Sequence, residues 1–275
     1  MLRRPFYASL AAVGLVSMMG IAGNAMAAGS PIWVGSADYT QAPGGTAANT
    51  EQVGPFNEFD FSSAGVTLLK PGTVAGDYDG YYQSFVNQHL LNGVFAPSAK
   101  LNTSYELTVA ASFHEQVSGT NPLDLQLTGG DFNLFFGPSA NHDFNADSGF
   151  TDGASILHGT IIAGSGALFS KPSGSASGYS ELTIHVDSFD TNVFDPNTIA
   201  SGDSIFTLRV NNSLDSGFLN PIASVMGHTY SAANGDLKVA SDGNLVLSVP
   251  EPKAYALMLS GLGLVGFMAR RRKAA

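Results

Sequence analysis

Apolar and polar residues alternate in several stretches of this chain, and this period of two is the sequence feature that most limits how it can fold. Residues 104–117 place Leu107, Val109 and Phe113 on one face, and residues 179–189 repeat the pattern. Every second side chain of a β-strand lies on the same face, so these runs predict half-buried strands. Amphipathic helical segments are missing between them, which disfavours a parallel α/β sheet.

Turn-rich spacers separate about eight to ten such runs, a pattern typical of antiparallel β proteins. We therefore expect an all-β body folded as an antiparallel β-sandwich or jelly-roll. Residues 81–95 suit either a helix or a strand, and we prefer a strand because the neighbouring segments are strands. Ser241-Asp242-Gly243-Asn244 lies between two apolar runs and predicts a β-hairpin turn.

The first 27 residues have the three parts of a secretory signal peptide. Two arginines precede an uncharged apolar run over residues 6–21, and a small-x-small pattern closes the segment. Signal peptidase is therefore expected to cut after Ala27, and the residues that define this cleavage are Ala25, Ala27 and Ala28. A retained N-terminal anchor is the alternative interpretation.

Residues 249–275 combine three features in a fixed order. Pro250 and Pro252 favour an extended chain around Glu251. The uncharged segment 254–269 follows, and as a helix it would span about 24 Å, slightly less than the bilayer core of about 30 Å. The cations Arg270, Arg271, Arg272 and Lys273 come last, and the positive-inside rule places them in the cytoplasm. This order predicts a single short transmembrane helix, and a simple membrane anchor is one interpretation of it.

The complete order resembles the PEP-CTERM sorting signal of Gram-negative bacteria. The matching residues are Val249, Pro250, Glu251 and Pro252, then Leu257, Leu259, Gly261-Leu262-Gly263-Leu264 and Gly266, and finally Arg270, Arg271 and Arg272. The resemblance implies an exosortase as partner, a membrane-embedded transpeptidase that cuts near Pro-Glu-Pro. It also implies a precursor tethered to the inner membrane through the tail alone, and a product at the cell surface or in the extracellular matrix. Tails of this family are attached to unrelated bodies, so the resemblance assigns no chemistry to residues 28–248.

The body between the two signals is strongly acidic. It keeps five lysines and arginines against 21 aspartates and glutamates, a formal net charge of 5 − 21 = −16. Binding to nucleic acid or to anionic lipid requires basic surface, so neither partner is expected for the body. The chain has no cysteine, which excludes disulfides, thiol nucleophiles and thiolate metal sites.

Motifs for catalysis are also missing. The six histidines form neither HxH nor HExxH, and no GxSxG elbow or phosphate loop occurs. Carboxylate pairs such as Asp77 and Asp79 arise by chance in an acidic chain, so none is a candidate catalytic pair. We expect no catalytic residues and a protein that is not an enzyme.

Four residues alternate in a pattern that could hold calcium: Asn141, Asp143, Asn145 and Asp147. Calcium prefers oxygen ligands from such loops. Ser148, however, stands where an EF-hand loop needs glycine, and no glutamate closes the loop. An Asx-rich surface turn is therefore preferred, with a weak calcium site as the alternative and no other cofactor expected.

The two export signals and the acidic β body favour a structural or adhesive component of the extracellular matrix. The PEP-CTERM resemblance adds association with exopolysaccharide and with biofilm or floc formation. Within that family the body is weakly similar to flocculation-associated members, on residues 59–66, 129–136 and 193–196.

The alternative function is a carbohydrate-binding module, or a glycan-active enzyme, on a β-sandwich. Exposed aromatic side chains can stack on sugar rings, and the candidates for that role are Tyr78, Tyr81, Tyr82 and Phe144.

Overall fold

Extended strands make up most of the computed structural model, which describes residues 31–170, 176–199, 202–210, 217–250, 260 and 262. The all-β class expected from the alternation is confirmed. In chain order the elements are β1 (Gly35–Asp38), the 3₁₀ turn η1 (Tyr39–Gln41), β2 (Gln52–Phe56), β3 (Glu58–Phe61), β4 (Val66–Pro71), β5 (Asp77–Leu91), β6 (Val94–Ala96), β7 (Glu106–Gly119), β8 (Leu123–Gly137), β9 (Ala154–Ser170), β10 (Ala176–Phe189), β11 (Phe194–Asp195), β12 (Asp203–Val210), β13 (Ser224–Val225), β14 (His228–Thr229), η2 (Ala232–Asn234) and β15 (Leu237–Val246).

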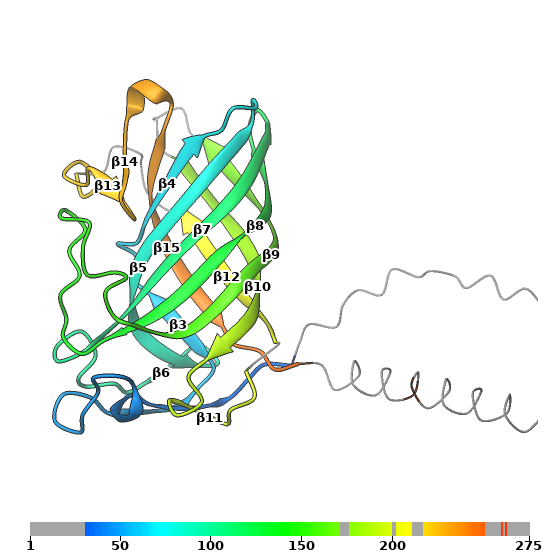
Figure 1. The fold of residues 1–275 in the computed structure, drawn as a ribbon. Helices are drawn as coiled ribbons and strands as arrows, with labels where there is room; N and C mark the ends of the chain where they lie inside the picture. Colours follow the sequence, from blue (N-terminus) through cyan, green and yellow to red (C-terminus); the bar gives the residue numbers. More distant parts are fainter. Residues whose placement is uncertain are drawn as a thin grey trace, which may run out of the picture.

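Within the described residues, one sheet of ten strands closes on itself into a barrel (Figure 1). Strands β5, β7, β8, β9, β10, β12 and β15 each pair antiparallel with the next one in this series. The ring closes because β15 also pairs with β3 and β4, and both of these pair with β5. Closure leaves the long strands without free edges, which protects them from pairing with other chains.

The antiparallel pairing agrees with the sequence, but the expected arrangement in two sheets does not. A sandwich or jelly-roll has two sheets packed face to face, whereas these strands form one sheet in simple meander order. The reason is that alternation shows only that each strand has one buried face. The same pattern arises whether that face meets a second sheet or the interior of a barrel.

The two ends of the barrel differ. We call one end the base, where the small sheet β11-β1-β2 lies across the opening. There the Trp33 ring contacts Phe56 and Phe194 edge to face, with ring centroids 5.4 and 6.2 Å apart, and its Nε1 donates to the Pro196 carbonyl at 2.8 Å. We call the other end the mouth, where β4 turns into β5 and β7 into β8. The base is therefore closed by aromatic packing.

Aromatic rings also fill the middle of the barrel. Phe206 of β12 lies 5.2 Å from Phe132, 5.8 Å from Phe61 and 5.5 Å from Tyr82, measured between ring centroids. All four side chains are buried. Such ring contacts contribute about 0.5–1.5 kcal/mol each beyond the area that they bury.

Two local expectations have different outcomes. Residues 81–95 form the end of β5 and most of β6, joined by a turn at Asn92-Gly93, and so are strands as preferred from the sequence. The hairpin expected at residues 241–244 is wrong, because these residues lie inside the continuous strand β15. Gly243 has a structural role there: a Cβ atom at this position would lie 2.8 Å from the Tyr82 hydroxyl oxygen. It therefore admits the tyrosine to the interior rather than turning the chain.

The expected signal peptide, residues 1–27, lies outside the described residues. The same holds for the apolar segment 254–269, apart from Ser260 and Leu262. In the part of the chain that the structure describes, no helix has the length and apolarity needed to span a membrane.

Candidate functional site

The two ends of the body lie side by side at the base. Beyond β15, Trp33 N–H donates to the Leu247 carbonyl at 2.9 Å, and Val249 N–H donates to the Pro31 carbonyl at 2.8 Å. Ile32 and Ser248 form an antiparallel bridge between these two bonds. The chain therefore passes from the barrel into the predicted sorting signal at a point that is held to the base.

Of the predicted sorting residues, the structure describes Val249 and Pro250. Val249 is half-buried and packs against the main hydrophobic core. Glu251, Pro252 and the run Arg270–Arg272 lie outside the described residues, as do the cleavage residues Ala25, Ala27 and Ala28.

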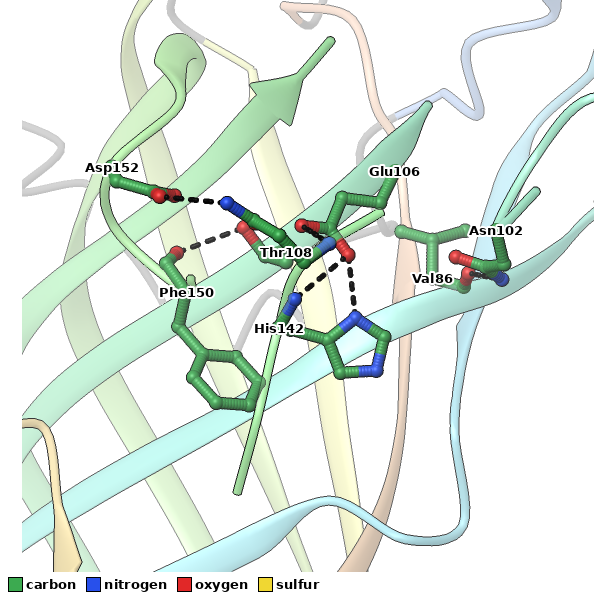
Figure 2. Close-up of polar contacts among 8 residues, drawn as sticks. Val86, Asn102, Glu106, Thr108, His142, Phe150 and Asp152 are labelled. Atoms are coloured by element: carbon green, nitrogen blue, oxygen red, sulfur yellow. Dashed lines mark hydrogen bonds and ion pairs between the residues drawn. The ribbon is translucent and has the colours of Figure 1, made fainter. Parts of the chain in front are cut away.

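A polar cluster that the sequence did not suggest lies on the outer wall of the barrel, near the start of β7. Figure 2 shows the carboxylate of Glu106 facing the loop that follows β8. Its Oε1 accepts from the Asn141 amide at 3.0 Å, and its Oε2 lies 2.5 Å from His142 Nδ1. Thr108 Oγ1 donates to the Phe150 carbonyl at 2.8 Å and holds the far end of the same loop. We call Glu106, Asn141 and His142 the loop anchor.

Within the loop anchor, Asn141 is exposed, whereas the side chains of Glu106 and His142 are largely shielded from solvent. The Glu106 side chain is 1% exposed and that of His142 is 18% exposed. The His142 ring also stacks on Phe85, with centroids 4.1 Å apart and an angle of 25° between the rings. A buried carboxylate is stable only when it is paired, and these contacts provide its partners. The cluster therefore attaches the loop to the wall.

A second segment, residues 217–230, covers the outer face of β4 and β15. Its side chains form a separate small core with the outward residues of these strands, consisting of Val66, Leu68, Leu219, Ile222, Val225 and Ala240. The Asp147 carboxylate joins the two covering segments by accepting from the amides of Met226 and Gly227 at 3.0 and 2.8 Å. We call the surface made by residues 138–153 and 217–230 the loop face.

The four candidate calcium ligands do not converge in this arrangement. Asp143 Oδ1 accepts from the Asn145 amide at 2.8 Å within its own turn, while Asp147 reaches to residues 226 and 227. Asn141 belongs to the loop anchor, and its side chain donates to Asp152 at 3.1 Å. Across the described residues, no group of three or more histidine, aspartate or glutamate side chains is placed to hold a metal ion. Asp143 Oδ1 also accepts from the Ala146 amide at 3.2 Å, so this residue forms an Asx turn.

The four candidate sugar-stacking aromatics also do not form one platform. Tyr82 is fully buried inside the barrel, so its expected exposure is wrong. Tyr81 is covered by His228, whose ring stacks on it at 3.6 Å, and Phe144 packs on Phe150 at 4.7 Å. Tyr78 is partly buried against the main core. Neighbouring strand residues face opposite sides, which separates Tyr81 from Tyr82.

A polar depression of about 150 Å³ lies on the outer wall where β3, β12 and β15 meet. It contains Glu58, Asp60 and Asp242 together with Arg209. Partial burial raises the pKa values of Glu58 and Asp242, the negative charge of Asp60 raises both further, and Arg209 opposes the rise. Arg209 already balances part of this negative charge, so we do not interpret the depression as a cation-binding site.

His89 and Glu115 are buried titratable residues that were not predicted from the sequence. His89 lies beneath the base with its Nε2 2.7 Å from the Tyr39 hydroxyl, and Glu115 points into the barrel near the mouth. Glu115 could have been found by extending the alternation of residues 107–113 by one more step. His89 falls in the segment whose period was ambiguous, so its burial had no clear signal.

The fold defines an all-β body whose last strand leads within a few residues into the C-terminal segment. The family comparison identifies that segment. The PEP-CTERM protein-sorting motif matches residues 248–273, so this is a protein that carries the PEP-CTERM sorting motif after its β body. The motif indicates an exported protein that is processed by an exosortase. Comparisons with curated proteins and with solved structures find no match.

Proposed function

We propose that this protein is a non-catalytic component of the cell surface or extracellular matrix of a Gram-negative bacterium. Its body would be structural or adhesive in biofilms or flocs that contain exopolysaccharide. The observation that carries the proposal is the position of the sorting motif, which begins at residue 248, two residues after β15 ends at Val246.

The proposed route has three steps. Signal peptidase removes residues 1–27 on export, and the apolar segment 254–269 then holds the precursor in the inner membrane with Arg270–Arg272 in the cytoplasm. Exosortase cuts near Pro250-Glu251-Pro252 and releases the body to the surface. The pairing of residues 31–33 with residues 247–249 supports a proposed orientation in which the base lies nearer the membrane than the mouth.

The surface chemistry supports a matrix role. A body with a formal net charge of −16 repels its own copies and stays dispersed until it meets a polymer or a cation. The loop face offers irregular backbone and polar side chains on a rigid wall, which is where proteins commonly carry contact surfaces. Exopolysaccharide is the proposed partner because it is the polymer of that matrix.

The test of sorting is the intact mass and the cell fraction of the native protein. The variant Pro250→Ala/Glu251→Ala/Pro252→Ala is compared with wild type and with the control Pro97→Ala/Glu181→Ala, which changes the same residue types at exposed positions. We expect wild type and control to end near Pro-Glu-Pro and to be found in the matrix, and the triple variant to stay in the membrane. If wild type keeps its complete C-terminus in the membrane fraction, the tail is a simple anchor and the proposal fails.

The matrix role needs a separate test. A strain that lacks the protein is compared with one complemented by wild type, and both floc formation and retained exopolysaccharide are measured. We expect both quantities to fall in the deletion strain and to recover with wild type but not with the triple variant. Equal flocculation and equal polysaccharide in all strains would contradict the structural or adhesive role while leaving the sorting result intact.

A further inference from the structure

The barrel interior is not filled up to the mouth. A cavity of about 70 Å³ lies there, surrounded by strands β4, β7, β8, β9, β10, β12 and β15. Its wall is mainly apolar, and the side chains that matter below are Phe113, Leu125, Leu208 and Val239. Each of these four is at most 7% exposed. The cavity is thus an apolar chamber within the barrel.

The sequence keeps this chamber open in two ways. Phe113 forms its floor by lying over Gly80, where a Cβ atom would be 2.1 Å from the phenyl ring. Small side chains line the wall above it, including Thr67, Ser180 and Ser241. The Thr67 and Ser241 hydroxyls satisfy each other at 2.7 Å. The wall therefore leaves space without leaving these two hydroxyls unpaired.

Glu115 brings a carboxyl group into this mainly apolar lining. It is 4% exposed, it lines the cavity, and its Oε1 has no hydrogen-bond partner among the residues that the structure describes. Burial raises the pKa of this carboxyl to about 7. Among the described lining residues, the only other titratable side chain is Tyr179 of β10, and none is cationic. A buried acceptor without a partner is unfavourable, so a ligand that supplies a donor gains affinity here.

We propose that the cavity binds a small alkyl primary amine, with the ammonium group at Glu115 and the hydrocarbon against Leu125, Leu208 and Val239. A cation is favoured over a neutral donor because it compensates a buried carboxylate most strongly. The acidic body also attracts cations towards the mouth.

The size of the cavity limits the ligand. An apolar cavity of about 150 Å³ takes up benzene, so about 70 Å³ admits roughly three carbon atoms. A longer chain must extend through the mouth, past Leu168 and the exposed ring of Tyr179. Affinity is therefore expected to rise steeply over the first carbons of an alkylamine and more slowly afterwards.

The charge states set the pH range for binding. Glu115 is ionised above its raised pKa of about 7, and an alkylammonium group stays protonated up to about pH 10. Among the residues that the structure describes, the strands around the cavity bring no other carboxylate and no cationic side chain to its lining. Binding should therefore be strongest near pH 8–9, a window that follows from these two values.

The experiment uses the mature exported protein in about 0.15 M salt, where long-range attraction to surface charges is screened. n-Propylamine and n-hexylamine are titrated calorimetrically at pH 8.5 and followed by NMR, with n-hexanol and n-hexanoate as matched probes. We expect hexylamine to bind saturably and hexanoate not to bind. Glu115→Gln should weaken hexylamine at least tenfold and leave hexanol unchanged, while Glu181→Gln, at an exposed position, should change neither.

A second variant tests the position of the ligand. Val239→Phe should fill the cavity and abolish binding of amine and alcohol alike. The proposal is overturned if hexylamine binds wild type and Glu115→Gln equally, or if Val239→Phe retains it. It is also overturned if no probe binds saturably, which would mean that the cavity holds water only. None of these results depends on how the tail is processed.

Discussion

Glu115 and His89 are buried at opposite ends of the barrel, and their titrations act on stability in opposite directions. Burial raises the pKa of Glu115 from 4.5 to about 7, and burial lowers the pKa of His89 from 6.5 to about 3. Both shifts favour the neutral side chain in the folded state. Their contributions oppose each other between about pH 4.5 and 6.5, so single variants are needed to separate them.

The first residue-scale prediction concerns Glu115→Gln. Because the folded pKa is raised, the stability that Glu115 contributes is complete below pH 4.5 and is lost as the pH rises to about 7. Relative to the glutamine variant, wild type should lose roughly 3 kcal/mol at most over this interval. Urea unfolding of both proteins at pH 4.5 and pH 8 measures the difference. Parallel pH profiles of the two proteins would show that Glu115 is not buried as described.

The second concerns His89→Gln, which keeps an acceptor for the Tyr39 hydroxyl. Because the folded pKa is lowered, the stability contributed by neutral His89 is complete above pH 6.5 and is lost as the pH falls towards 3. In that window, each pH unit of acidification should lower the wild-type free energy of unfolding by about 1.4 kcal/mol more than it lowers that of the variant. Thermal melts at pH 4 and pH 7 test this. An equal acid sensitivity in both proteins would contradict it.

At the scale of elements, two covering segments turn part of the plain barrel wall into the loop face. Residues 138–153 are tied to β7 at Glu106 and Thr108, and residues 217–230 are packed on β4 and β15. The bonds from Asp147 to Met226 and Gly227 then join one segment to the other. The loop face is therefore ordered by a few polar contacts rather than by strand pairing.

Glu106→Gln tests that view. An amide in place of the carboxylate turns one acceptor into a donor that faces the Asn141 and His142 amides, so the loop should detach locally. We expect a loss of about 1–3 kcal/mol in unfolding free energy and faster hydrogen exchange over residues 138–153. Strands β9 and β10 should keep their protection, and Glu181→Gln should behave as wild type. Unchanged exchange in the loop would mean that Glu106 does not hold it.

At the scale of the whole molecule, the stability of the barrel depends on the side chains that pack in its interior. Aromatic side chains close the base and fill the middle, and a cavity lies at the mouth. Residues 31–33 and residues 247–249 pair with each other at the base of the barrel. The base therefore joins the first and last segments of the body and leads into the sorting motif.

Ile184→Asp should therefore prevent folding. Ile184 is fully buried in β10, and an unpaired charge there costs several kcal/mol, a large part of the about 5–15 kcal/mol by which domains are stable. Thr183→Asp, on the opposite face of the same strand, is the matched control and should melt cooperatively like wild type. Circular dichroism melts of the exported proteins measure this. A soluble Ile184→Asp variant with a cooperative melt would contradict the inward position of Ile184.

Local patterns account for what could be predicted. The inward positions of Leu107, Val109 and Ile184 follow from alternation, because a strand side chain faces one side or the other according to its place in the sequence. The sorting motif at residues 248–273 is likewise a contiguous signal that is read from the chain directly. The all-β class, the side of the strand on which each of these residues lies, and the sorting motif could therefore be predicted without knowing any long-range contact.

Features that depend on distant residues could not be obtained in this way. Closure into a barrel requires β15 to meet β3, β4 and β12, and alternation does not specify those pairings. The need for glycine at position 243 of β15 comes from the nearby Tyr82 hydroxyl, more than 150 residues earlier in the chain. The mouth cavity depends on side chains from several strands around Glu115, and it exists because closure of the sheet brings them to one place.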